Sequence, residues 1–409
     1  MHRAPTISIF ERCITILYLD HPTVPIEDEK RSGMKVLHCI KATRISGAER
    51  HLLILLSALR ARDVDAQLVL LVEPQNLMTE MVDLAEKRGI PVQRLIIRQD
   101  IDLLVIRRLK QMFQAAKPDV VHTHLIHADV LGLPAARWAG VPVIITGRHN
   151  DDAFRRRAAV RWLNGQLWGR VTAGIAISES IRRFAIEIEG APPQKVRVVP
   201  YGFEYMPLMP DALRDARTRL QAEQGLAPDS LLVGMACRLV EQKGVIYGLR
   251  AFRQIADEFP NAYLLIAGDG ELRATLEQEA GDLAQFGRVR FLGWREDVPG
   301  LMAGLDIFLM PSLWEGFGLV LLEAMSKQLP IVASRVSAIP EVVIHGETGL
   351  LVPPRDVEGF AEALRLLLPD RSLRAYMGMN GEDRLEQTFS AVRMAEETKA
   401  VYEEFLRKS

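Results

Sequence analysis

Short apolar segments alternate with amphipathic segments along most of the chain, and this alternation constrains the fold more than any other feature. In the first half the apolar segments are 35–40, 66–72, 120–124, 142–146, 173–178 and 196–200. Amphipathic stretches such as 47–62 and 103–116 lie between them. Short apolar strands that alternate with helices predict a parallel sheet with helices on both faces. The first half is therefore expected to form a doubly wound α/β domain.

The same alternation restarts after a proline-containing segment, 200–210. The apolar runs are now 230–239, 262–270, 289–294, 305–310, 330–334 and 349–354. A chain of 409 residues also exceeds what one hydrophobic core usually supports. We therefore predict two doubly wound domains joined by a hinge near 200–210. Ligands of such sheets bind beyond the carboxyl ends of the strands, so a binding cleft between the domains is expected.

The two halves carry opposite net charges although the whole chain is almost neutral. Residues 1–205 contain 29 Lys and Arg against 22 Asp and Glu, whereas residues 206–409 contain 22 against 30. The halves thus carry +7 and −8, within a total of −1. A basic half joined to an acidic half predicts different partners for the two domains.

Cysteine usage and hydropathy favour a cytoplasmic protein. The three cysteines are Cys13, Cys39 and Cys237, and no two of them form a CxxC pair. This pattern argues against a disulfide framework and a cysteine zinc site, and it is typical of a reducing compartment. No stretch approaches the roughly 20 apolar residues that a membrane span needs.

The first 33 residues do not fit the alternation. The apolar stretch 7–19 is interrupted by Glu11 and Arg12, so it makes a poor signal peptide. A polar, proline-containing stretch follows, and a strand-like segment then starts at Met34. We predict that residues 1–33 are a disordered or non-native extension.

The segment PSLWEGFGLVLLEAM (311–325) contains the strongest chemical signal. Glu315 and Glu323 lie on either side of a turn that contains Gly316 and Gly318, between an apolar run and a helical stretch. Free N–H groups at a fresh helix N-terminus attract anions. Carboxylates repel phosphate but accept hydrogen bonds from hydroxyl groups. The pair therefore favours a ligand that carries both groups, such as a nucleotide sugar.

Two cations follow the first strand of the second domain. Arg238 and Lys243, in CRLVEQKG, are placed to grip a diphosphate, the arginine by its planar fork and the lysine as a point charge. Two solvated surface cations would be the ordinary interpretation of this motif alone. The GDG turn (268–270) is not a dinucleotide fingerprint, because Arg273 occupies the position of the third glycine.

Several motifs together resemble glycosyltransferase family 4, which has the GT-B fold. In the second half they are CRLVEQKG, LLIAGDGELR, FLGWREDV, PSLWEGFGLVLLEAM and IVASRVSAIPEVVIHGETGLLVPPRD, and in the first half ISGAER, KPDVVHTH, GVPVIITGRHN and VVPYGFE. The resemblance implies two Rossmann-like domains that face each other across a cleft. Residues 34–203 would form the acceptor-side domain and 204–390 the donor domain. Residues 391–409 would form a helix that crosses back to the first domain.

The resemblance also implies a reaction and a set of roles. The enzyme would move a sugar from a nucleoside-diphosphate sugar with retention of configuration, and it would need no metal or other cofactor. Arg238 and Lys243 would bind the diphosphate, the N–H groups of Gly316, Phe317, Gly318 and Leu319 the distal phosphate or the sugar, and Glu323 the ribose hydroxyls. Glu315 would lie near the reacting sugar.

Two first-domain positions match family residues near the donor. His149, in TGRHN, matches a histidine that reaches the donor sugar. Gly47 matches one member of a glycine pair that lets the backbone approach the diphosphate, a use that suits a residue without Cβ. Ser46, Cys237 and the pair 337–338 replace glycines of the family pattern, so the motifs define the shape of the donor pocket less closely.

Other motifs suggest metal sites and are interpreted differently. His122, His124 and His127 form an HxHxxH pattern, but no acidic ligand stands in the same stretch. A structural or acceptor-side role is favoured for them. The DxD sequences 63–65 and 100–102 do not end an apolar strand, so both are expected to be surface turns.

The segment 154–170 is basic and contains tryptophan. It carries Arg155, Arg156, Arg157, Arg161 and Arg170, with Trp162 and Trp168 and no acidic residue. Such a surface suits an anionic membrane, although a solvated helix is an equally good interpretation. Nucleic acid is less favoured because no recognition module accompanies the segment.

The leading prediction is a glycosyltransferase at the inner face of the cell membrane that acts on a lipid-linked saccharide or on a glycolipid or polysaccharide precursor. Alternatives are a nucleotide-sugar epimerase or phosphorylase on the same plan, or a non-catalytic nucleotide-sugar-binding subunit. The four charged residues Arg238, Lys243, Glu315 and Glu323 are all present, which argues against a site that has decayed.

Overall fold

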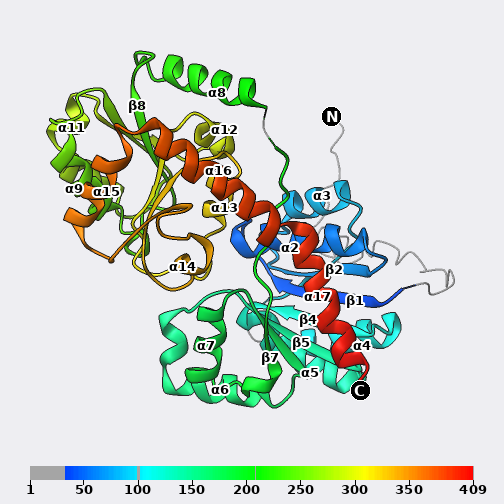
Figure 1. Cartoon of the computed structure of the whole chain (residues 1–409). Coiled ribbons are helices and arrows are strands. Elements are labelled where there is room, and N and C mark those ends of the chain that lie inside the picture. The colour runs from blue at the N-terminus through cyan, green and yellow to red at the C-terminus, as the bar shows by residue number, and fades with distance from the viewer. Residues whose placement is uncertain (1–32, 99–101, 208, 409) are drawn as a thin grey trace, which may run out of the picture. The chain divides into compact units, whose positions relative to one another are not determined.

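Two parallel sheets make up the fold of the computed structural model, which describes residues 33–98, 102–207 and 209–408 (Figure 1). Residues Met34–Ser409 form one compact unit. Of the predicted N-terminal extension, residues 1–32 lie outside the described residues. The prediction of two doubly wound α/β halves is confirmed.

The first sheet has seven parallel strands in the order β3-β2-β1-β4-β5-β6-β7. They are β1 (Lys35–Lys41), β2 (Asp65–Val72), β3 (Val92–Ile96), β4 (Val120–His124), β5 (Val143–Arg148), β6 (Ala173–Ala176) and β7 (Val196–Val198). Their connecting helices are α2 (Gly47–Arg60), α3 (Thr79–Lys87), α4 (Leu103–Ala116), α5 (Leu125–Ala139), α6 (Ala158–Trp168) and α7 (Glu179–Glu187). The strand order reverses between β1 and β4, which makes their carboxyl ends the switch point where such sheets bind ligands.

The second sheet has six parallel strands in the order β10-β9-β8-β11-β12-β13. They are β8 (Leu231–Ala236), β9 (Ala262–Ala267), β10 (Val289–Gly293), β11 (Ile307–Met310), β12 (Ile331–Ser334) and β13 (Gly349–Val352). Its helices are α8 (Pro210–Glu223), α9 (Val245–Ile255), α10 (Arg273–Ala280), α11 (Asp282–Gln285), α12 (Val298–Ala303), α13 (Leu319–Met325), α14 (Ile339–Val342), α15 (Val357–Leu367) and α16 (Arg371–Thr388). The switch point of this sheet lies between β8 and β11.

Burial explains which strands were predicted from the sequence. Every residue of β4 and of β12 is buried, as expected for parallel strands covered on both faces. Such strands appear in the sequence as continuous apolar runs. The edge strand β3 was not predicted, because its residues are half-buried or exposed and include the polar Gln93 and Arg94.

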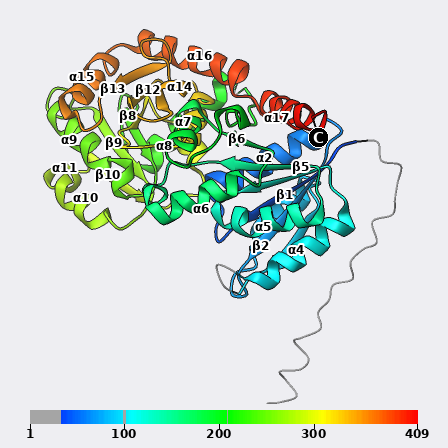
Figure 2. The same ribbon diagram turned by 90° about the horizontal axis from the view of Figure 1, so that it is seen from below.

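The last helix, α17 (Ala391–Leu406), packs on the first sheet rather than the second (Figures 1 and 2). Tyr402 is fully buried and lies 2.8 Å from the His122 ring, and Glu404 pairs with Arg197 at 2.6 Å. The two chain crossings between the halves are hydrogen-bonded to each other, since Phe203 N–H donates to Phe389 O and Ala391 N–H donates to Phe203 O. The predicted hinge segment, 200–210, is therefore hydrogen-bonded at Phe203 to the second segment that links the two halves.

Candidate active site

The switch point of the second sheet brings Lys243 and Glu315 together. The Lys243 Nζ atom lies 2.5 Å from Glu315 Oε2, and the side chains are only 16% and 13% exposed. Partial burial strengthens the attraction between such charges. Arg238, after β8, is exposed, and no acidic side chain of the described residues pairs with it. The charge of Lys243 is therefore already neutralised by Glu315, whereas Arg238 is accessible to an anionic ligand.

Backbone contacts between two loops create this pair, although the partners are 72 residues apart. Leu313 N–H donates to Gln242 O at 2.8 Å, and the Gln242 side chain donates to Trp314 O at 3.1 Å. Gly244 has φ +57°, and a Cβ atom there would lie 2.1 Å from Pro311 O. Only glycine permits this approach, which presses the loop carrying Lys243 onto the loop carrying Glu315.

The glycine turn after β11 lies against the first sheet. Gly318, at φ +88°, is the N-cap of α13. A Cβ atom on Gly316 would lie 2.6 Å from the carbonyl oxygen of His149, and Ser178 Oγ donates to Gly316 O at 3.2 Å. The Phe317 side chain is 3% exposed and packs edge-on against Tyr201. Phe317 therefore anchors the turn, and only its backbone is available to a ligand.

Glu323 lies on α13 beside the start of α2. Its side chain is 15% exposed, and its Oε1 atom is 3.6 Å from Arg50 Nη1. Burial raises the pKa of Glu323, while the charges of Arg50 and Lys327 oppose this shift. A Cβ atom on Gly47 would lie 3.6 Å from Leu319 Cδ1. The structure thus brings Gly47, Leu319 and Glu323 close together, and their role in binding the donor stays a prediction.

The His149 ring faces the interior of the first sheet. Its Nδ1 atom lies 2.6 Å from the Tyr201 hydroxyl and its Nε2 atom 2.9 Å from His124 Nδ1. The residue is 9% exposed, and burial lowers the pKa of His149 to about 3. What His149 presents to the glycine turn is its backbone carbonyl. This orientation was not predicted from the sequence.

The basic segment 154–170 is only partly a surface. Arg155 is 2% exposed and pairs with Glu189 at 2.5 Å, and Glu189 in turn binds Arg148 at 2.6 Å. Trp168 is 1% exposed and packs under the Arg148 guanidinium. The prediction was therefore wrong for Arg155 and Trp168, which belong to a buried ion-pair network. Nothing in the run of arginines signals which one meets the distant Glu189.

The other arginines and aromatic residues of the basic segment are exposed, whereas Asn164 and Leu167 are buried. Trp162 is 68% and Phe154 37% exposed, and the arginines around them on the surface are Arg156, Arg157, Arg161 and Arg170. Trp162 and Arg161 line a groove of about 330 Å³ with Ile188 and Gly190. This smaller group is a basic surface with two exposed aromatic rings.

The metal-like motifs do not assemble as their spacing suggested. His127 is exposed on α5, away from His122 and His124, whereas His38 of β1 joins those two, with ring nitrogens within 4.8 Å. Asp102 caps α4 by accepting from Leu104 N–H. Asp63 is a turn residue at φ +59°, whereas Asp65 is the first residue of β2, so the predicted surface turn is confirmed at Asp63.

Family models match most of the chain. A model described as "Glycosyl transferase 4-like domain" matches residues 46–202, and one described as "Glycosyl transferases group 1" matches residues 216–384. The chain belongs to this glycosyltransferase family. It is therefore an enzyme that transfers a sugar from a nucleotide sugar, with the retention typical of the family.

Solved structures and curated relatives agree with this assignment. The glycosyltransferase is similar to HepE of Anabaena in complex with UDP, with a TM-score of 0.79 and 23% identity over 91% of this chain and all of that one. It is 29% identical to an α-1,3-galactosyltransferase of Escherichia coli over 74% of this chain and 79% of that protein. It is 28% identical to phosphatidyl-myo-inositol mannosyltransferase of Mycolicibacterium smegmatis over 83% and 86%. Among its described helices, none is long and apolar enough to cross a membrane.

Proposed function

We propose that this glycosyltransferase transfers a sugar from a UDP-sugar to a lipid-linked glycan precursor. The observation that carries the proposal is the Lys243–Glu315 pair beside the Gly316–Gly318 turn, at the switch point of the second sheet. For the base, support comes from relatives. HepE has been solved with UDP and glucose, and the E. coli relative is named for UDP-Gal.

The donor diphosphate would lie between Arg238 and Lys243. The exposed Arg238 is free to form a bidentate pair with phosphate. Lys243 would exchange part of its contact with Glu315 for the phosphate that leaves with the nucleotide. Catalysis then consists of positioning the donor and stabilising negative charge on the leaving group. In this arrangement Glu315 would hold the lysine and lie beside the reacting sugar, and it need not act as a nucleophile.

The sugar-nucleoside part of the donor would meet uncharged groups and one carboxylate. Glu323 would accept hydrogen bonds from the ribose hydroxyls, a role that suits a partly buried carboxylate that lies 3.6 Å from Arg50 and also feels the charge of Lys327. Gly47 and the turn at Gly316 would let backbone N–H groups approach the phosphates closely. His149 would contact the sugar from the first sheet.

The acceptor would be held at a membrane surface. Two relatives are named for lipid acceptors, GlcNAc-diphosphoundecaprenol and phosphatidyl-myo-inositol. The exposed surface around Trp162 and Phe154, with Arg156, Arg157 and Arg161, has the composition that favours an anionic interface. We therefore place the enzyme peripherally on the inner face of the cell membrane.

We expect the protein to co-float with vesicles that contain phosphatidylglycerol and to remain unbound with phosphatidylcholine alone. The double variant Arg161→Gln/Trp162→Ala should lose most of this binding, because it removes a surface charge and the most exposed ring of the segment. The variant Trp294→Ala is the matched control, since Trp294 is 71% exposed but lies in the second half. If the double variant floats as well as the wild type, the exposed surface around Trp162 does not bind the membrane.

A thermal-shift screen against UDP-, GDP-, ADP- and CMP-sugars in the presence of EDTA tests the donor. Ligands that bind only the folded protein raise its melting temperature. A UDP-sugar is expected to give the largest rise and to support transfer in the same buffer. A rise only when Mn²⁺ replaces EDTA, or a larger rise with another base, would contradict the proposal. Binding without transfer to any lipid-linked acceptor would contradict the proposed acceptor.

A further inference from the structure

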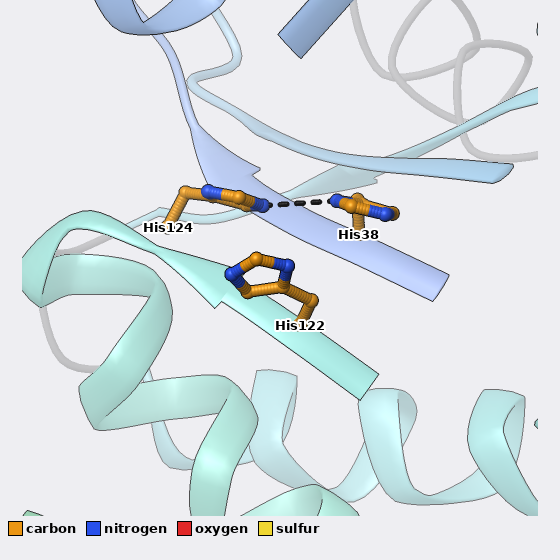
Figure 3. Close-up of side chains that lie close together, drawn as sticks. All are labelled: His38, His122 and His124. Carbon is orange, nitrogen blue, oxygen red and sulfur yellow. Dashed lines mark hydrogen bonds between the residues drawn. The ribbon is translucent and has the colours of Figure 1, made fainter. Parts of the chain in front are cut away.

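Buried histidines and tyrosines gather at the switch point of the first sheet, beneath α2 and α17. They are His38, His51, His122, His124, His149, Tyr201 and Tyr402, and none is more than 9% exposed. His38 on β1 lies opposite His122 on β4 in the strand register, and His124 follows on the same face. Figure 3 shows His38, His122 and His124 projecting from these two strands toward one another.

Hydrogen bonds join most of these rings in one line, here called the imidazole chain. Its members in order are His122, Tyr402, His38, His124, His149 and Tyr201. The successive distances are 2.8 Å from His122 Nδ1 to the Tyr402 hydroxyl, 3.4 Å on to His38 Nε2, 3.0 Å from His38 Nδ1 to His124 Nε2, 2.9 Å from His124 Nδ1 to His149 Nε2, and 2.6 Å from His149 Nδ1 to the Tyr201 hydroxyl. The imidazole chain thus connects Tyr402 of α17 to His149, whose carbonyl oxygen lies beside the glycine turn.

Each imidazole of the chain is neutral. Burial lowers the pKa of His38 and of His149 to about 3, and it lowers the pKa of His122 and of His124 well below the usual value. A neutral imidazole donates from one ring nitrogen and accepts at the other. When both nitrogens are engaged, the hydrogen bonds along the chain must all point the same way. His38, His124 and His149, whose ring nitrogens are both engaged, are therefore either all protonated at Nε2 or all protonated at Nδ1.

The ends of the chain favour protonation at Nε2. In that state the Tyr201 hydroxyl donates to His149 Nδ1, and a phenol is a stronger donor than a neutral imidazole. The other end is His122 Nε2, which like His51 Nδ1 has no hydrogen-bond partner among the described residues. Both histidines line a cavity of about 10 Å³, measured as space for the centre of a water molecule. That is close to the volume one water needs, and such a water would accept from His122 and donate to His51.

A buried metal ion is the competing interpretation of the same histidines. The ring planes of His38 and His124 differ by 10° and their centroids are 5.3 Å apart. With the facing nitrogens 3.0 Å apart, the rings therefore lie edge to edge, as a hydrogen bond requires (Figure 3). If the two rings bound one metal ion, the lone pairs of their nitrogens would point at the ion and not at each other. No carboxylate of the described residues belongs to the group.

We propose that His124, His38 and Tyr402 are positioning residues that hold His149 in its Nε2-protonated form. The proposal rests on the proposed function, because His149 matters to transfer only if it meets the donor sugar. To do so its ring would exchange the bond to His124 for one to a sugar hydroxyl, and Nε2–H is the group it would then offer. Tyr402 of the last helix thereby determines, through His38 and His124, which ring nitrogen of His149 carries the proton.

Nitrogen-15 NMR of histidine-labelled protein near neutral pH tests this directly, because ring nitrogen shifts distinguish the tautomers. Signals are assigned with single His→Gln variants. In the wild type we expect His38, His124 and His149 all to be protonated at Nε2. In Tyr402→Phe, which keeps the ring but removes the hydroxyl, we expect His149 to show a mixture of tautomers and kcat to fall severalfold with little change in the donor KM. Tyr205→Phe is the matched control, since its hydroxyl donates to Glu382 outside the chain.

Three results would overturn the proposal. The first is that His38, His124 and His149 differ in tautomer in the wild type. The second is that the His149 spectrum is unchanged in Tyr402→Phe. The third is stoichiometric metal in protein purified without added metal. Unchanged kcat in Tyr402→Phe despite a mixed tautomer would overturn the positioning role. Uniform tautomers in a protein that binds no nucleotide sugar would support the imidazole chain and refute the proposed function, so the two failures are distinguishable.

Discussion

Lys243→Ala is expected to lower kcat/KM for sugar transfer by about two to three orders of magnitude, the usual effect of removing one group that stabilises developing charge. The loss has two physical sources. The leaving diphosphate loses its closest point charge, and Glu315, which is 13% exposed, is left as an unpaired carboxylate beside the phosphate site. Steady-state transfer assays with saturating acceptor measure the effect.

Two further variants separate these sources. In Lys243→Ala/Glu315→Gln no unpaired carboxylate remains, so partial recovery over Lys243→Ala would measure the repulsion by Glu315. Lys408→Ala breaks another lysine–glutamate pair, at 2.7 Å from Glu404, on the exposed end of α17. It should leave activity unchanged, because exposed pairs contribute little. Wild-type kcat/KM in Lys243→Ala would remove this residue from the donor site.

Glu323→Gln is expected to raise the donor KM strongly without loss of folded stability. Hydrogen bonds to a charged acceptor contribute about 1.5–3 kcal/mol each, so loss of the ribose contacts should lower kcat/KM by roughly ten- to a hundredfold. Stability should not fall, because burial raises the pKa of Glu323 in the folded state. As the pH rises above the unfolded pKa, ionisation of this carboxylate therefore disfavours folding.

The measurement pairs donor kinetics with denaturant unfolding of the same preparations. Glu362→Gln, an exposed glutamate on α15, is the control and should alter neither quantity. A Glu323→Gln enzyme that is less stable than the wild type and binds donor normally would show that the carboxylate is structural. A variant that is equally stable and impaired only in donor binding would support the ribose contact.

The sequence predicted the fold well where strands are fully buried, because such strands are continuous apolar runs. It also predicted that Glu315 and Lys243 belong to one site. Their convergence depends on short turns directly after β8 and β11, and strand ends of a parallel sheet meet at one edge. The edge strand β3 escaped prediction because the polar Gln93 and Arg94 interrupt its apolar residues.

Long-range pairing explains what the sequence did not reveal. Arg155 is a core residue only because Glu189 lies 34 positions away to neutralise it. His38 joins His122 only because β1 and β4 are neighbours in the sheet, across 84 positions of sequence. The direction of the His149 ring depends on Tyr201 and His124 together. None of these partners is marked by local spacing, so a motif search cannot identify them.

The path of α17 has a consequence for how the protein is made. Domains often fold one after another as the chain leaves the ribosome. Here the strands of the first sheet emerge early, but Tyr402, which buries its histidines, is synthesised only after every strand of the second sheet. We expect the histidines of the first half to stay open to water in the nascent polypeptide until α17 has emerged. The first sheet would then be completed by a helix that the ribosome makes after the whole second sheet.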